Sequence, residues 1–277
     1  MNRRSLLLSG IASTWAATAA HAQTQPNNRG AVLVFGGTGK LGSEIVKLLV
    51  AAGDDVTVFT RQSSGHELLA GLKVDIAIGD MTDDKSVAAA FDRKKFRAVI
   101  DASANREPGA ERGAAGRAER RRGGPEGDSK GFYETTMRIM AAHAKRTGVN
   151  HFILHGSVLA GDNIELFPQF AFIKGSGTII DKGRAEKILI DSGVPYTIIR
   201  HGRVPSDPQP PATGHARLTL SQDVFGDLTR ADLAILTLDC LDNPARINKI
   251  YHAWDDTFKN DRPLPTAPRG TPAPSKE

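Results

Sequence analysis

Three glycines with the spacing Gly36-x-x-Gly39-x-x-Gly42 are the residues of this chain best suited to hold a phosphate group. They follow an unbroken apolar run at 31–35 and precede a helical pattern of apolar residues that begins at Ile45. A strand, a glycine turn and a helix in this order form a phosphate-binding unit, because the free N–H groups of the helix N-terminus face the pyrophosphate of a dinucleotide. The motif therefore predicts dinucleotide binding.

Two other interpretations of this stretch are a P-loop and a glycine turn in an unrelated α/β unit. The P-loop is excluded, because Gly39-Lys40 is followed by Leu41 and because Val34 stands where the first glycine should be. The unrelated turn stays open at this stage. The predicted cofactor-binding residues of the turn are Gly36, Gly37, Thr38, Gly39, Lys40, Leu41 and Gly42.

Arg61 follows the second predicted strand, at 56–60. NAD-binding units usually place an acid here to bind the 2′-hydroxyl of the ribose. An arginine can instead pair with a 2′-phosphate through charge-assisted hydrogen bonds. This favours NADP (as NADPH) over NAD, the alternative being a solvated surface arginine.

A third strand is predicted at 74–78, followed by Asp80 and Met81. At that position a carboxylate can accept a hydrogen bond from an adenine amino group, so both residues join the predicted cofactor site. Thr82 or Asp83 is expected to cap the helix that follows.

The fourth predicted strand, at 98–101, ends in the small residues Ala102, Ser103 and Ala104. Small side chains at the carboxyl end of a strand leave room for a ligand across the sheet. These three residues complete the predicted cofactor site.

Helices and strands alternate through the rest of the chain. The pattern predicts a helix at 132–147, strands at 151–155, 195–200 and 247–254, and a helix that begins at Lys182. The economical arrangement is an α/β fold, in which parallel strands carry helices on both faces.

Residues 1–22 have the pattern of an export signal. Arg3-Arg4 precedes an apolar stretch at 6–20, and an Ala-x-Ala cleavage sequence ends at Ala22. The apolar stretch is too short and too weak for a membrane span. We expect a periplasmic protein, exported by the twin-arginine route or by an ordinary secretory signal. The alternative is an uncleaved N-terminal anchor.

The mature chain is expected to contain a linker at 23–28, one NAD(P)-binding domain at 29–256 and a disordered tail at 257–277. Residues 105–129 interrupt the domain with a stretch rich in Gly, Ala, Arg and Glu that lacks apolar periodicity. We expect a mobile insertion. It is either a lid that orders on an anionic substrate or a solvated loop.

Composition excludes some classes of function. The net charge is only +5, and much of the excess lies in the insertion and the N-terminus, so a nucleic-acid partner is not indicated. The single cysteine, Cys240, rules out an intramolecular disulfide framework and a multi-cysteine metal site. We expect it to be a small core residue, and we expect no metal site.

The order of motifs resembles the NAD(P)H-binding, NmrA-like branch of the atypical short-chain dehydrogenase/reductases over residues 29–254. The motifs that carry the resemblance are the glycine turn, Thr60-Arg61, Gly79-Asp80-Met81-Thr82-Asp83, Gly148-Val149-Asn150-His151-Phe152, Ser157, Lys182-Gly183-Arg184-Ala185-Glu186, Pro195-Tyr196-Thr197-Ile198-Ile199-Arg200 and Thr229-Arg230-Ala231-Asp232-Leu233-Ala234. The resemblance implies a Rossmann-type, doubly wound parallel sheet with strand order 3-2-1-4-5-6. A small C-terminal part would cover the substrate.

The resemblance also identifies Ser157 and Lys182 as catalytic candidates. The wider superfamily pairs this lysine with a tyrosine four residues earlier, but that position holds Thr178, which cannot act as an acid. His201 stands where most relatives have proline. His155 and His201 could supply a proton near neutral pH, or they could be structural.

The expected function is hydride transfer from NADPH to a small planar acceptor, such as a flavin or a quinone, by a monomer or homodimer with no nucleic-acid partner. The branch that the chain resembles includes flavin and biliverdin-type reductases, which work without the tyrosine. The alternative is a non-catalytic, redox-sensing protein of the NmrA type. Isomerase or sugar-nucleotide chemistry would require the tyrosine and a larger C-terminal domain.

Overall fold

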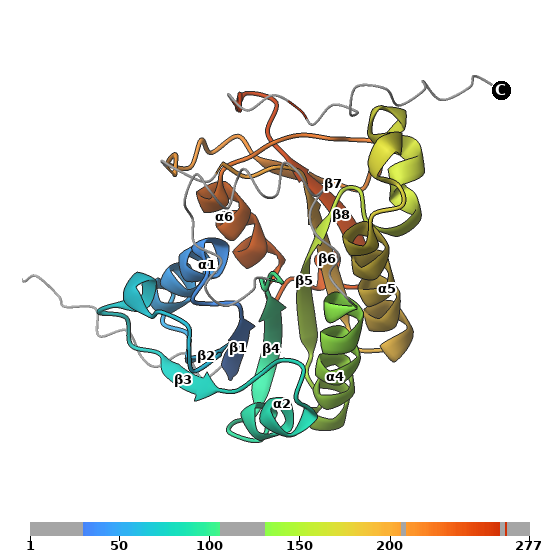
Figure 1. Cartoon of the computed structure of the whole chain (residues 1–277). Coiled ribbons are helices and arrows are strands. Elements are labelled where there is room, and N and C mark those ends of the chain that lie inside the picture. Colours follow the sequence, from blue (N-terminus) through green and yellow to red (C-terminus); the bar gives the residue numbers. More distant parts are fainter. Residues whose placement is uncertain (1–29, 106–130, 206–208, 261–263, 265–277) are drawn as a thin grey trace, which may run out of the picture.

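The computed structural model describes residues 30–105, 131–205, 209–260 and 264 (Figure 1). The predicted signal, the linker and most of the predicted insertion and tail lie outside the described residues. Among the helices within these ranges, none combines the length and the apolar character needed to cross a membrane.

The centre of the fold is a sheet with the strand order β3-β2-β1-β4-β5-β6-β8-β7. All neighbouring strands in it run parallel except β7 and β8. The strands are β1 (Ala31–Phe35), β2 (Val56–Thr60), β3 (Asp75–Ile78), β4 (Phe96–Asp101), β5 (His151–Ser157), β6 (Tyr196–His201), β7 (Arg217–Thr219) and β8 (Lys249–Trp254).

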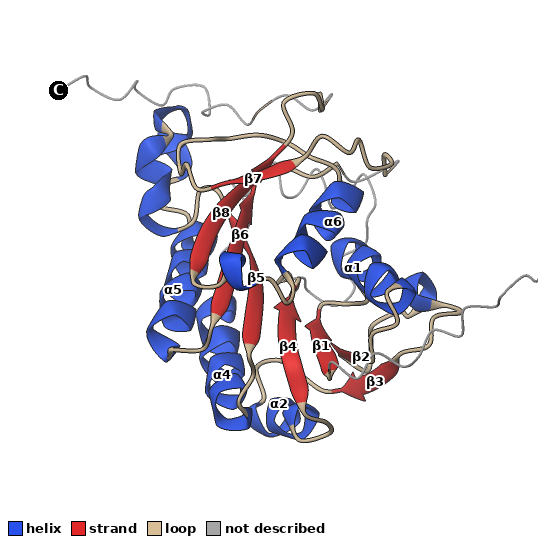
Figure 2. Cartoon of the chain, turned by 180° about the vertical axis from the view of Figure 1, so that it is seen from behind, coloured by secondary structure: helices blue, strands red, loops and turns tan. Residues whose placement is uncertain are grey.

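Helices cover both faces of this sheet, as Figures 1 and 2 show. One face carries α1 (Lys40–Ala51) and α6 (Arg230–Cys240), and the other carries α2 (Asp84–Phe91), α4 (Phe132–Thr147) and α5 (Gly177–Ser192). Central strands must therefore be apolar on both sides. Every residue of β1, β2 and β4 is indeed buried, and this explains the unbroken apolar runs in the sequence.

The predicted Rossmann-type α/β fold is confirmed, and three details differ from the sequence-based expectation. The strand predicted at 247–254 is present as β8, but the sheet continues beyond it into an antiparallel edge strand that was not predicted, β7, whose Arg217 guanidinium stacks on the ring of Trp254. The 160–177 segment, where the sequence pattern predicted neither a helix nor a strand, forms two 3₁₀-helices, η2 (Gly161–Leu166) and η3 (Pro168–Ile173). Finally, α5 begins at Gly177, so Lys182 lies inside the helix and does not open it.

The last two of these differences have a common cause in tertiary packing. Phe167, Phe170 and Ile179 bury their side chains in a third apolar cluster that also includes Phe225. Burial of these residues stabilises short helical turns that the local sequence does not favour by itself. Ile179 at the start of α5 joins the same cluster as residues of η2 and η3, and its burial favours a helix that begins at Gly177.

The order of the strands creates a switch point between β1 and β4. The chain runs from β1 outward through β2 to β3, and then returns to the other side of β1 for β4, β5 and β6. Ligands of doubly wound sheets bind at the carboxyl ends of the strands at such a point.

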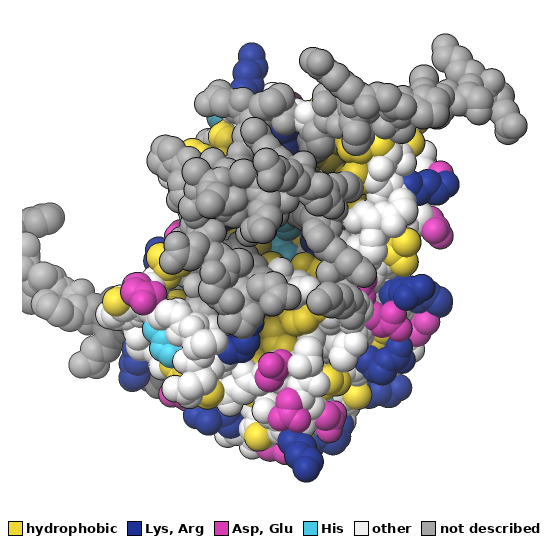
Figure 3. Space-filling model, viewed as in Figure 1, with side chains coloured by type: hydrophobic (Ala, Val, Ile, Leu, Met, Phe, Trp, Pro, Cys, Tyr) yellow, Lys and Arg dark blue, Asp and Glu magenta, His cyan; other side chains and the backbone are white. Residues whose placement is uncertain are grey.

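On the face shown in Figure 3, side chains of both charge signs are interspersed over the lower part of the molecule.

Candidate functional site

The glycine turn leaves the carboxyl end of β1 and leads directly into α1. Gly36 has a φ of +73°, a conformation that side chains other than glycine rarely adopt. The N–H of Gly39 donates to the Gly36 carbonyl at 2.9 Å, which closes the turn. Gly39 is the N-cap of α1, and it provides no side-chain cap for the first N–H groups of the helix. Those groups therefore face the region beyond the turn, as an anion requires.

Packing in the turn is too close for side chains. A Cβ atom at Gly42 would lie 2.1 Å from the Gly36 carbonyl oxygen, and one at Gly36 would lie 2.7 Å from the Ala102 carbonyl. A Cβ at Gly37 would lie 2.8 Å from Val58. The turn therefore packs on the ends of β2 and β4, and its backbone is the surface offered to a ligand. This arrangement fits a dinucleotide.

The residues predicted to flank the nucleotide lie along the same edge of the sheet. The Thr38 and Thr60 hydroxyl oxygens lie 3.5 Å apart, which links the turn to the end of β2, and Arg61 is the next residue of the chain. Asp80 follows β3, and its Oδ1 accepts from the N–H and the hydroxyl of Thr82 at 2.8 and 2.7 Å. These bonds hold the carboxylate in one orientation. Asp83, not Thr82, caps α2.

Of the remaining predicted residues, Lys40 and Leu41 open α1, and Met81 packs against the apolar cluster beneath α2 and α4. Ala102, Ser103 and Ala104 continue from β4 past the turn, and the Ala102 N–H donates to the carbonyl of Phe35 at 3.1 Å. The structure thus gathers the predicted cofactor-binding residues at the carboxyl edge of β1, β2, β3 and β4.

Sequence reasoning missed the residue that closes β4. Asp101 is buried and accepts a hydrogen bond from the Ser103 N–H at 2.9 Å. Burial raises the pKa of Asp101, and hydrogen bonds from Ser103 and the positive charge of Lys182 oppose that rise. The signal in the sequence that could have identified Asp101 was a lone carboxylate at the end of an otherwise apolar run.

The two catalytic candidates come from neighbouring elements. Ser157 is the last residue of β5, paired in register with His201, and its Oγ accepts the Leu159 N–H at 3.3 Å. Lys182 lies in the second turn of α5, with its Nζ 5.1 Å from the ring centroid of Tyr133 on α4. Lys182 is therefore close enough to the end of β4 for its charge to act on Asp101.

Of the two alternatives for His155 and His201, proton donor near neutral pH or structural residue, the structure supports the structural one. Burial lowers the pKa of His155 to about 3 and that of His201 to about 4, so both imidazoles are neutral at pH 7. Their contacts are structural. The His201 Nδ1 lies 2.9 Å from the Gly202 carbonyl, and His155 Nε2 lies 3.2 Å from the Thr237 hydroxyl on α6. Because that hydroxyl donates to the Leu233 carbonyl, Nε2 must carry the ring hydrogen of His155.

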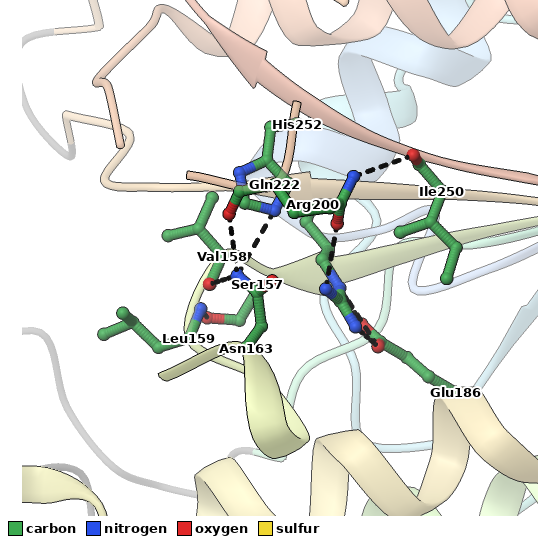
Figure 4. A network of polar contacts seen from close by, with 9 residues as sticks. All are labelled: Ser157, Val158, Leu159, Asn163, Glu186, Arg200, Gln222, Ile250 and His252. Atoms are coloured by element: carbon green, nitrogen blue, oxygen red, sulfur yellow. Dashed lines mark hydrogen bonds and ion pairs between the residues drawn. The ribbon is translucent and has the colours of Figure 1, made fainter. Parts of the chain in front are cut away.

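A buried polar network joins α5 to the sheet, and sequence reasoning missed it as well (Figure 4). Glu186 accepts from the Arg200 guanidinium, with an Nη2–Oε2 distance of 2.6 Å, and Arg200 Nη1 donates to Gln222 Oε1 at 3.1 Å. Gln222 in turn donates to the Ile250 carbonyl of β8 at 3.1 Å. The ion pair joins two of the motifs quoted above, the one that contains Glu186 and the one that contains Arg200.

A groove of about 950 Å³ lies beside this network, between η2 and α5. Its lining includes Ile164, Ile180 and Arg200, and none of the glycine-turn residues. The groove is therefore separate from the predicted nucleotide site.

A glycine turn at the switch point of a parallel sheet defines a dinucleotide-binding protein of the Rossmann type. A family model described as NAD(P)H-binding matches residues 36–244, most of the chain. The chain belongs to this NAD(P)H-binding family.

The chain is similar in sequence to a named relative and in fold to named solved structures. Sanguinarine reductase of Eschscholzia californica is 29% identical over 246 residues, which cover 79% of this chain and 87% of that protein. The structure of the anaerobilin reductase ChuY from Escherichia coli O157:H7 superimposes with a TM-score of 0.66 at 22% identity, covering 83% of this chain and 99% of ChuY.

A short-chain dehydrogenase/reductase from Veillonella parvula, solved in complex with NADP, superimposes with a TM-score of 0.60. It is 13% identical and covers 84% of this chain and 98% of its own. At such identities the solved structures show the shared fold alone. Together the comparisons describe an NAD(P)H-binding, reductase-like family.

Proposed function

We propose that the protein is an NADPH-dependent reductase that transfers a hydride to a small planar acceptor, such as a flavin or a quinone. The observation that carries the proposal is the uncapped, glycine-lined start of α1 at the switch point of the sheet. The reductase names of the relative and of the structural neighbour support it. When bound, the reduced nicotinamide would supply the hydride.

The chain's own residues would bind and orient the two reactants. Backbone N–H groups of the glycine turn and the start of α1, other than the N–H of Gly39, would hold the pyrophosphate, and Asp80 would accept from the adenine amino group. The small residues 102–104 would leave room for the nicotinamide end, near Lys182 and Ser157. Aligning a hydride donor with its acceptor in this way supplies a large part of the rate acceleration without further chemistry by the protein.

Arg61 supports the choice of NADPH. It directly follows β2, where its guanidinium could form charge-assisted bonds to a 2′-phosphate. We further propose that the chain is exported to the periplasm and matures near Gln23, as the pattern at 1–22 indicates.

A calorimetric titration of residues 23–277 with NADPH and with NADH tests the cofactor assignment. We expect Arg61→Ala to weaken NADPH binding by about 10- to 100-fold, the equivalent of about 1.5–3 kcal/mol for a charged hydrogen-bonded pair. NADH binding should change little. Arg146→Ala is the matched control, because Arg146 lies at the far end of α4 in an exposed pair with Asp92.

Each outcome has a distinct meaning. Equal affinity for NADPH and NADH would refute the phosphate contact, and no binding of either would refute the reductase. Binding without oxidation of NADPH by FMN, menadione, biliverdin or sanguinarine would favour the second candidate, a redox-sensing protein of the NmrA type. The threonine at position 178, in place of the superfamily tyrosine, is the observation that favours this second candidate.

A further inference from the structure

The position of the superfamily tyrosine is occupied in this chain by a residue that cannot replace it. Thr178 is 4% exposed and lies one helical turn before Lys182 on α5, so it has neither the acidity nor the access to serve a bound acceptor. A different tyrosine, Tyr133, lies beside the same lysine. The Lys182 ammonium is 5.1 Å from the centroid of its ring.

Two backbone hydrogen bonds fix Tyr133 relative to Lys182. The carboxylate of Asp181 accepts the Tyr133 N–H at 3.0 Å and the Glu134 N–H at 2.8 Å. Asp181 precedes Lys182 in the chain and is 4% exposed, so the turn of α5 that carries the lysine also holds the first turn of α4. An anion at the N-terminus of a helix is a favourable and well-defined contact.

The Tyr133 hydroxyl reaches the predicted nicotinamide end of the site. It accepts the Asn105 N–H at 3.2 Å, and Asn105 continues the segment 102–104 that follows β4. Within the described part of the chain the hydroxyl donates to no acceptor, so its proton is available to a bound molecule. Lys182 makes no ion pair there with a carboxylate, which leaves its charge to act on Tyr133 and Asp101.

We propose that Tyr133, brought from α4, takes the place of the missing tyrosine on α5 as proton donor, with Lys182 stabilising the phenolate that forms. This proposal rests on the proposed reductase function and narrows its substrate class to acceptors with a carbonyl oxygen, such as quinones. The quinone gains a hydride from the reduced nicotinamide, which is oxidised, and the electron pair of a C=O bond moves to oxygen. That oxygen takes the proton of Tyr133, and the phenolate regains a proton from water.

Two acceptors with different proton requirements test this role. Reduction of menadione, a quinone, consumes one hydride and one proton, whereas the iminium carbon of sanguinarine needs only a hydride. We expect Tyr133→Phe to lower kcat for menadione by about 100-fold or more, as the loss of a general acid does. The kcat for sanguinarine and the Kd for NADPH should stay within about threefold of the wild-type values, because the ring beneath Lys182 remains.

The control is Tyr196→Phe at the amino end of β6, which should affect neither acceptor. The solvent deuterium isotope effect on menadione reduction is a second readout, expected in the wild-type protein and lost in Tyr133→Phe. Equal losses with both acceptors would show a packing role and overturn the proposal, as would no loss with menadione.

Assays of the wild-type protein distinguish a failure of this proposal from a failure of the proposed reductase function. If it oxidises NADPH with sanguinarine but not with menadione, the reductase stands and the carbonyl class is refuted. If it binds NADPH but oxidises it with none of FMN, menadione, biliverdin and sanguinarine, the reductase itself is refuted.

Discussion

At the scale of single residues, Gly42 shows two opposing effects of a side chain. In a helix interior, alanine is more favourable than glycine by about 1 kcal/mol. At Gly42 the added Cβ would lie 2.1 Å from the Gly36 carbonyl oxygen, which belongs to rigid backbone. The clash therefore decides the outcome.

We expect Gly42→Ala to lower the free energy of unfolding by about 1–3 kcal/mol, the usual cost of overpacking, and to weaken NADPH binding because the turn must shift. Urea denaturation and calorimetry measure the two effects. Gly175→Ala is the control, since a Cβ there meets no atom within 4 Å. An unchanged midpoint and affinity for Gly42→Ala would show that the turn is not packed as described.

At the scale of elements, the site depends on how α4 is held against α5. These two helices pack along the same face of the sheet, and the Asp181 carboxylate of α5 caps the backbone of α4 at Tyr133 and Glu134. The cap is buried, so water cannot replace it when the carboxylate is removed.

We expect Asp181→Ala to lower the free energy of unfolding by about 1–3 kcal/mol, because it leaves two part-buried N–H groups without their charged acceptor. Chemical denaturation with circular dichroism measures this loss. Asp191→Ala on the same helix is the matched control. Its pair with Lys187 is exposed on both sides, and such pairs contribute about 0–1 kcal/mol. Equal effects of the two variants would refute the capping role.

At the scale of the whole molecule, buried imidazoles couple folding to pH. Burial lowers the pKa of His151 and His201 to about 4 and that of His155 to about 3. A folded-state pKa below the unfolded value of about 6.5 means that the unfolded chain binds more protons. The contribution of these neutral imidazoles to stability is therefore fully present above about pH 6.5, and it is lost as the pH falls toward their folded-state pKa values.

We expect each of the three imidazoles to reduce the free energy of unfolding by about 2 kcal/mol between pH 7 and pH 5. Buried carboxyl groups with a raised pKa, such as Asp101, act in the opposite direction. Comparison with a variant isolates one histidine. Below pH 6.5, His155→Gln should reduce the number of protons taken up on unfolding by about one, so that the free energy of unfolding falls less steeply as the pH is lowered. His215→Gln, at an exposed position, should leave this slope unchanged. Parallel curves for His155→Gln and the wild-type protein would contradict the burial argument.

The sequence by itself determined the local elements and the nucleotide end of the site. The strand at 56–60 and the helix at 132–147 have the bounds that periodicity predicts, because apolar spacing and glycine C-caps are local signals. The glycine turn and the segments after β2, β3 and β4 could also be placed from sequence. Strands of a parallel sheet end at one edge, so residues after them must lie together.

Only the tertiary structure decided what long-range packing controls. The pairs Tyr133–Lys182, Asp181–Glu134 and Glu186–Arg200 each join separate elements, and no periodicity within one element encodes such a contact. The early start of α5 and the 3₁₀-helices depend on burial in a third cluster that forms only in the folded chain, and the antiparallel β7 depends on its pairing with β8. The lowered pKa values of His155 and His201 were also decided by the tertiary structure, because the pKa of an imidazole depends on the elements that enclose it.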